Sequence, residues 1–257
     1  MAAERERERE NSRWIPKASG VVGLLMILSS LAVPANAETW STLYQTDFST
    51  DPGWITNNAS RYHWDFGSGS YYTEQVNGSN EYSYHLLSDL DLSKRVRLEY
   101  DIKPVSIQYA ADLRMGLTSE ALSAETPVTM TVIITDGGAT LRCSDLAGHT
   151  SGPNTEYGTV RGEWYHVLLE WNPSNGSVLS RETRKSDGMV IGEQEITGYG
   201  PFTGIDRIAL SQVNHVFGGP LAATGYIDNL AILQTPEPAT LSLLALGGLA
   251  LLRRRKR

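Results

Sequence analysis

The residues best suited to chemistry in this 257-residue chain are carboxylates that alternate along short segments. Glu99 and Asp101 stand two positions apart, and so do Glu193 and Glu195. Because successive side chains of a strand point to opposite faces, each pair would place its carboxyl groups on one face. Two such groups can serve as acid and nucleophile on a glycosidic bond, and Glu170 is a further candidate. Solvated charges on the outer face of a sheet explain the same residues without catalysis.

The other nucleophiles and metal ligands are too scattered to define a second kind of catalytic site. Ser68 and Ser70 lie in a Gly-rich segment that does not form a Gly-x-Ser-x-Gly elbow. The five histidines form no His-x-x-x-His pair, and the single cysteine, Cys143, excludes an intramolecular disulfide. The sequence therefore predicts a domain that is not an enzyme and has no catalytic residues. A glycan-active hydrolase or lyase that uses Glu99, Asp101 and Glu170 is the alternative.

Two aspartates near the ends of the central region are candidate calcium ligands. Asp47 begins this region and Asp228 lies near its end. If the first and last strands pair, the two carboxylates would meet, and Ca²⁺ prefers several oxygen ligands. A structural calcium ion would stabilise a domain that has no disulfide. The competing interpretation is that both aspartates cap turns.

A cluster of aromatic residues is the candidate ligand-binding surface. Aromatic rings stack on the apolar faces of sugars, while neighbouring polar groups supply directed hydrogen bonds. The alternative is that the same rings fill a core. Alternation would place Tyr62 and Trp64 on one face of a strand and His63 on the other, so only part of the cluster can be exposed. The predicted ligand-binding residues are Trp54, Tyr62, Trp64, Tyr71 and Tyr72.

These candidates must be positioned by strands, because no stretch of residues 38–234 has sustained helical periodicity. In residues 97–103, Leu98, Tyr100 and Ile102 share one face. Residues 164–171 alternate in the same way, and residues 128–135, 206–211 and 225–233 also indicate strands. Turn sequences separate such segments. Roughly a dozen strands in one domain predict an all-β fold of two packed antiparallel sheets.

The order of three short segments resembles that of concanavalin A-like jelly rolls, the fold of laminin G-type modules, lectins and β-glucanases. The segments are Asp47–Trp54, Glu163–Val167 and Gly225–Leu230. The resemblance implies a two-sheet jelly-roll sandwich over residues 38–234. The glucanase branch has Glu-x-Asp-x-x-Glu on one strand, but Pro104 and Gly198 stand where the third acid would follow the two pairs. The resemblance therefore does not carry glucanase activity to this chain.

The N-terminal region has the order of a secretory signal peptide. Arg13 and Lys17 precede a largely apolar run over residues 18–32. Ala35 and Ala37 then form the small-residue pair that signal peptidase accepts, which predicts cleavage of residues 1–37 and a new N-terminus at Glu38.

The C-terminal region, residues 235–257, combines three features. Pro236-Glu237-Pro238 interrupts regular structure, residues 239–252 are uncharged and mostly apolar, and Arg253, Arg254 and Arg255 begin a basic end. A helix of this length rises about 21 Å, so it is short for a hydrocarbon core of about 30 Å. Basic residues that remain cytoplasmic would place the central domain outside.

These three features in this order resemble the PEP-CTERM sorting signal of Gram-negative bacteria. The resemblance implies recognition and removal of the tail by an exosortase-type membrane protease. It also implies a setting of exopolysaccharide and biofilm matrix. A plain membrane anchor would explain the helix and the bases but not Pro236-Glu237-Pro238.

The whole chain has a formal net charge of −7, and both ends are basic, so the central domain is strongly acidic. This argues against a nucleic-acid partner. We therefore expect an exported β-sandwich that passes through an inner-membrane intermediate to the cell surface or matrix, where it binds glycans such as exopolysaccharide. A purely structural surface protein is the remaining alternative.

Overall fold

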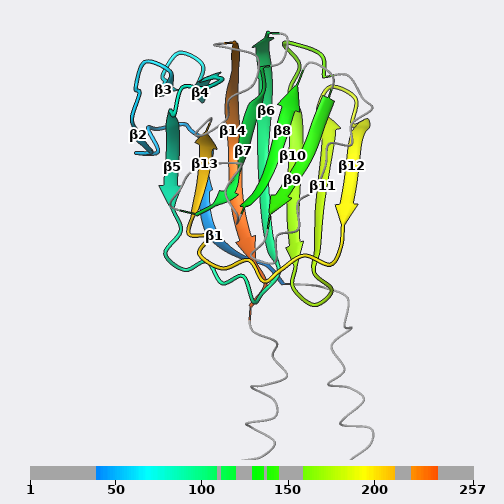
Figure 1. Ribbon diagram of the computed structural model, residues 1–257. Coiled ribbons are helices and arrows are strands. Elements are labelled where there is room, and N and C mark those ends of the chain that lie inside the picture. The colour runs from blue at the N-terminus through cyan, green and yellow to red at the C-terminus, as the bar shows by residue number, and fades with distance from the viewer. Residues whose placement is uncertain are drawn as a thin grey trace, which may run out of the picture. The chain divides into compact units, whose positions relative to one another are not determined.

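The computed structural model describes residues 39–108, 111–119, 129–135, 138–144, 159–211 and 221–236, and its regular secondary structure there is entirely β-strand (Figure 1). No helix in these ranges is long and apolar enough to cross a membrane. The predicted helix at 239–252 lies outside them. So do Ala35, Ala37, Glu38, Glu237, Pro238 and Arg253 to Arg255, whereas Pro236 is exposed at the end of the domain.

Two antiparallel sheets face each other. The larger has eight strands in the order β12 (Val190–Ile196), β11 (Ser177–Arg184), β10 (Tyr165–Asn172), β6 (Val96–Ile107), β14 (Ala222–Gln234), β4 (Ser70–Val76) and β3 (Tyr62–Asp65), with β1 (Ser41–Thr46) also paired to β14. The smaller has the order β2 (Ile55–Thr56), β5 (Tyr82–Leu86), β13 (Arg207–Ser211), β7 (Leu113–Thr118), β8 (Thr129–Thr135) and β9 (Gly138–Ser144). The prediction of an all-β sandwich with two antiparallel sheets is confirmed.

Alternation of side chains builds the core between the sheets. Leu98, Tyr100 and Ile102 of β6 are buried, and Tyr165 and Val167 of β10 lie beside them. The intervening residues of both strands lie on the outer face of the eight-stranded sheet. The strands predicted over 97–103 and 164–171 therefore have the expected core face.

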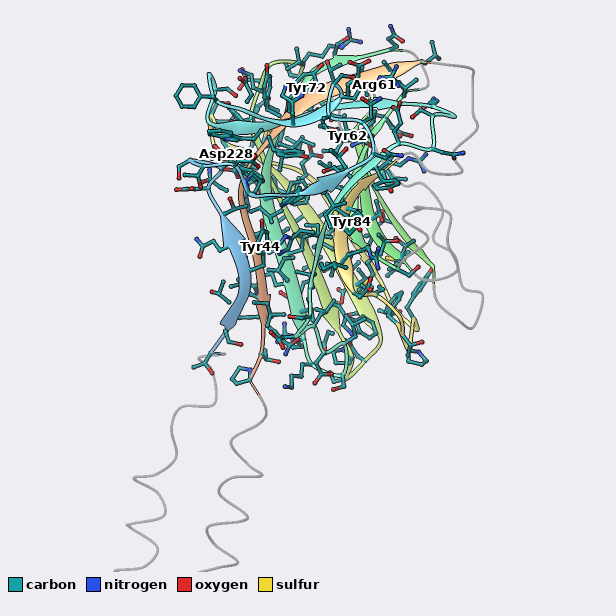
Figure 2. The ribbon with its side chains drawn as sticks, turned by 90° about the vertical axis from the view of Figure 1, so that its left-hand side faces the viewer. Tyr44, Arg61, Tyr62, Tyr72, Tyr84 and Asp228 are labelled. Atoms are coloured by element: carbon teal, nitrogen blue, oxygen red, sulfur yellow. The ribbon has the colours of Figure 1, made fainter. Side chains whose placement is uncertain are left out.

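Aromatic residues close the core near β1 and β5, at the edge of the sandwich seen in Figure 2. The ring centroids of Trp54 and Tyr71 are 5.1 Å apart, and those of Phe48 and Tyr71 are 5.7 Å apart. Tyr44 of β1 stacks on His85 of β5 at 3.9 Å, which joins the two sheets. Trp54 Nε1 also donates a hydrogen bond to Tyr44 Oη at 2.9 Å.

The first and last strands pair, as the sequence predicts. Thr46 of β1 lies opposite Leu230 of β14. The pairing of β14 with β6 shifts register between Asp228 and Ala231, where Asn229 has a positive φ of 47°. This irregularity turns the Asn229 side chain toward β6, where it takes part in the site described next.

Candidate functional site

The outer face of the eight-stranded sheet carries a row of aromatic and basic side chains that crosses the strands. Register places His63 of β3 opposite Tyr72 of β4, Tyr72 opposite Tyr226 of β14, and Tyr226 opposite Lys103 of β6. Trp164 immediately precedes β10 and continues the row beside Lys103, since Tyr165 pairs with Ile102. We call these five residues the aromatic–lysine row.

Contacts along the row hold its rings at the surface. The ring centroids of His63 and Tyr72 are 5.0 Å apart, and Tyr72 meets Tyr226 edge-on at 5.5 Å. Lys103 Nζ lies 6.0 Å from the centroid of the Trp164 ring. With strands about 4.8 Å apart, the row extends about 19 Å across the sheet. Every member is exposed or half-buried, so the row is an accessible platform.

A polar cluster lies beside the row, with Asp101 two residues from Lys103 on β6 and His166 of β10 two residues from Trp164. Asp101 of β6 accepts hydrogen bonds from His166 Nδ1 at 3.0 Å and Asn229 Nδ2 at 2.8 Å, and it forms an ion pair with Lys185. The Asp101 side chain is only 4% exposed, whereas those of His166 and Lys185 are 40% and 44% exposed. Asp101 is therefore a buried anchor that orients three accessible polar groups. We call these four residues the Asp101 cluster.

The cluster sets the ionisation of its own members. Burial opposes ionisation of Asp101, but hydrogen bonds from His166, Lys185 and Asn229 outweigh it and lower its pKa. The hydrogen bond to Asp101 in turn raises the pKa of His166. His166 and Lys185 thus both face a carboxyl group whose ionised form is favoured.

Asp228 of β14 lies directly opposite Asp101 and borders both the row and the cluster. Burial raises its pKa, and the carboxylates of Asp101 and Asp47 raise it further, whereas a 2.8 Å bond from Asn229 N opposes the rise. Figure 2 shows Asp228 and Tyr72 toward the same end of the sandwich, away from the start of β1 and the end of β14.

The predicted calcium ligands are close enough to interact electrostatically, as the effect of Asp47 on Asp228 shows. Asp47 Oδ1 also accepts a hydrogen bond from Ser49 N at 3.0 Å, which is the turn-capping role that the sequence left open. Within the described part of the chain, no group of three or more His, Cys, Asp or Glu residues could hold a metal ion. Calcium binding by Asp47 and Asp228 stays a prediction, which melting temperatures in calcium and in chelator would test.

The predicted ligand-binding aromatics divide between surface and core. Tyr72 lies in the aromatic–lysine row, and Trp64 is half-buried with its Nε1 donating to Phe48 O at 2.8 Å. Trp54, Tyr62 and Tyr71 are buried between the sheets. Their proposed contact with a ligand therefore disagrees with their burial, because they lie on the core side of their strands.

Several residues of the site were missed by sequence reasoning. Tyr226, Lys103 and Trp164 of the row are among them, as are Lys185 and Asn229 of the Asp101 cluster. The alternation in residues 97–103 and 164–171 already placed Lys103 and Trp164 on a polar face. Alternation alone does not give the register between strands. That register puts Lys103 opposite Tyr226, with Trp164 on the other side of Lys103.

Glu99, Asp101 and Glu170, the carboxylates of the alternative enzymatic prediction, have cationic partners. Glu170 forms ion pairs with Arg95 and Arg97, and Glu99 Oε1 lies 3.5 Å from Arg97 Nη1. Asp101 is paired within its own cluster. These ion pairs are consistent with solvated or structural charges on the outer face of the sheet.

A groove of about 880 Å³ lies at the other end of the sandwich. It is lined by Trp171 and by residues 90–93, 173–176 and 198–205. Two of its aromatic residues, Trp171 and Phe202, are buried and pack edge-on at 4.8 Å, which leaves Tyr199 as its half-exposed ring. The groove therefore presents less aromatic surface than the row.

Comparison with known proteins gives a match for the C-terminal motif and a likeness for the fold of the β-sandwich. Residues 234–257 match the PEP-CTERM protein-sorting motif. The chain is similar to winged bean acidic lectin complexed with methyl-alpha-D-galactose, with 7% identity and a TM-score of 0.50 over 77% of this chain and 99% of the lectin. At this identity the likeness concerns the fold. The chain thus carries a PEP-CTERM motif, and its fold is a lectin-like, concanavalin A-like jelly roll, as the sequence resemblances imply.

Weaker likenesses involve proteins of different kinds. The CBM2 module of Lactobacillus casei BL23 phage J-1 evolved Dit has 11% identity and a TM-score of 0.49, over 77% of this chain and 98% of the module. An endo-1,3-beta-glucanase from Streptomyces sioyaensis has 13% identity and a TM-score of 0.46, over 80% of this chain and 100% of the enzyme. No curated protein matches the chain.

Proposed function

We propose that this protein is exported to the cell surface or extracellular matrix, where its β-sandwich binds carbohydrate without catalysing a reaction. The aromatic–lysine row is the observation that carries the proposal. It offers ring faces for the apolar sides of sugar rings, with polar groups of the Asp101 cluster at hydrogen-bonding positions beside them. Because Asp101 fixes these groups in advance, little side-chain freedom is lost when a ligand binds.

The PEP-CTERM motif supports the proposed destination. In this account signal peptidase cleaves after Ala37, and the short apolar helix then holds the chain in the inner membrane. An exosortase-type protease removes the tail. The mature domain reaches the surface or matrix, where exopolysaccharide is the proposed partner.

A glycan microarray probed with the full-length protein tests the proposal. The expected result is selective glycan binding that decreases at least tenfold in Trp164→Ala. Trp40→Ala is the control, because the Trp40 ring lies over Arg97 and is not part of the row. This variant should bind as the wild type does. If the protein bound no glycan of the array, the result would contradict the proposal and favour a purely structural surface protein.

One observation favours a second candidate function, glycoside hydrolysis. Asp228 and Asp101 lie in register, and their pKa values are shifted in opposite directions, as in pairs of catalytic acids and nucleophiles. Release of reducing ends from a bound glycan, abolished in Asp228→Asn, would support this function. Binding without release would support the non-catalytic proposal.

A further inference from the structure

Lys103 lies between Tyr226 and Trp164 in the aromatic–lysine row, so an aromatic residue stands on each side of it. It lies opposite Tyr226 in the register of β6 and β14, and its Nζ is 6.0 Å from the Trp164 ring centroid. The adjacent residue Ile102 points into the core and is 1% exposed. The strand therefore fixes the Lys103 backbone while the half-buried side chain lies along the surface.

Lys103 differs from the other bases on this face in its pairing. Lys185 pairs with Asp101, Arg97 with Glu170, and Arg181 with Glu193. In the part of the chain that the structure describes, no carboxylate lies within ion-pair distance of Lys103. Its ammonium group lies over the Trp164 ring.

A ring is a weaker partner for an ammonium group than a carboxylate is. A cation–π contact at an exposed site stabilises less than a hydrogen bond to a charged group does. A ligand carboxylate would therefore compete successfully for Lys103. The rings of Tyr226 and Trp164 would remain available to the sugar that carries it.

We infer that the row prefers acidic glycans, with a uronate carboxylate seated on Lys103 between the rings of Tyr226 and Trp164. This inference rests on the proposed carbohydrate binding and adds the class of sugar. The acidic character of the whole domain opposes such a ligand only weakly. Charges beyond about 10 Å are largely screened. Of the acids beside the row, Asp101 is already paired. Asp228 lies opposite Asp101 on β14, and burial raises its pKa, which disfavours its charged form.

The test compares ligands that differ only in charge. Affinity electrophoresis of the full-length protein would use polygalacturonate and alginate, each beside its methyl-esterified form. The wild type should bind an acidic polymer at least tenfold more tightly than its ester. The Lys103→Gln variant should lose that difference, whereas Lys94→Gln, whose lysine pairs with Asp91 elsewhere on the domain, should keep it.

Other outcomes separate this inference from the proposed function. Equal binding of acid and ester, or a preference that survives Lys103→Gln, would overturn the inference and leave carbohydrate binding intact. Equal binding of dextran sulfate would show a general attraction to polyanions and would also overturn it. Absence of binding to every polymer and every glycan of the array would overturn both.

Discussion

Asp228 of β14 lies opposite Asp101 of β6, yet the pKa of Asp228 is raised and that of Asp101 is lowered. The difference arises from their partners. Asp101 receives hydrogen bonds from His166, Lys185 and Asn229, whereas Asp228 meets burial and two other carboxylates. Two aspartates at the same register position thus differ in role: Asp101 is a fixed anion, and Asp228 is a carboxyl group beside the row with no cationic side chain bonded to it among the described residues.

Replacement of the anchor should destabilise the domain. Asp101→Asn removes the charge that three donors share at a nearly buried position, and we expect a loss of about 2–3 kcal/mol in the free energy of unfolding. Urea unfolding would measure it. The control is Glu193→Gln, which breaks an exposed pair with Arg181 and should cost less than about 1 kcal/mol. Equal losses in the two variants would contradict the anchoring role.

The contribution of His166 to stability should depend on pH. Its pKa is raised in the folded protein by the bond to Asp101, so the folded state binds the proton more tightly than the unfolded state. The resulting stabilisation is complete below the unfolded value of about 6.5 and is lost as the pH rises through the folded pKa. His166→Asn should therefore destabilise more at pH 5.5 than at pH 8.5, as measured by thermal unfolding. A loss that is independent of pH would contradict this.

Glu182 of β11 should weaken the fold as the pH rises. It is 3% exposed and faces the core, where burial raises its pKa to about 7. Because the folded state holds this proton more tightly, stability should fall between about pH 4.5 and pH 7, by about 3 kcal/mol in total. Glu182→Gln should flatten the dependence of melting temperature on pH.

The exposed Glu195 of the neighbouring strand β12 provides the control for this experiment. Glu195→Gln should keep the pH dependence of the wild type. Parallel curves for the wild type and Glu182→Gln would show that Glu182 does not carry the effect.

The proposed processing at both ends predicts the mass of the mature protein. Mass spectrometry of the surface fraction should find Glu38 as the first residue and no residues from 239 onward. Replacing both Pro236 and Pro238 by Ala should leave an uncleaved form in the inner membrane, because the motif that the protease reads is lost. Recovery of the intact chain from the cytosol would contradict export.

The sequence predicts the strands well because alternation is a local property. Residues 97–103 and 164–171 show it clearly, and both become central strands of the eight-stranded sheet. Alternation also places His63 and Tyr62 on opposite faces of their strand. Alternation does not by itself identify the core side, so it cannot show that Tyr62 and Tyr71 face the core.

The site was harder to predict because it depends on register between distant strands. Tyr72, Lys103 and Tyr226 are far apart in sequence and become neighbours only when β4, β14 and β6 align. Asn229 reaches Asp101 because β14 departs from regular pairing at that point. Neither the alignment nor the irregularity is encoded in a short motif.

The most direct test of carbohydrate binding by this face is titration calorimetry of full-length variants with the strongest ligand from the array. Tyr226→Ala removes a ring from the row, and Tyr82→Ala removes a half-buried ring of the six-stranded sheet that packs on Tyr84 in a similar way. We predict that Tyr226→Ala raises the Kd at least tenfold and that Tyr82→Ala changes it less than twofold. Equal affinities of Tyr226→Ala and the wild type would contradict the account.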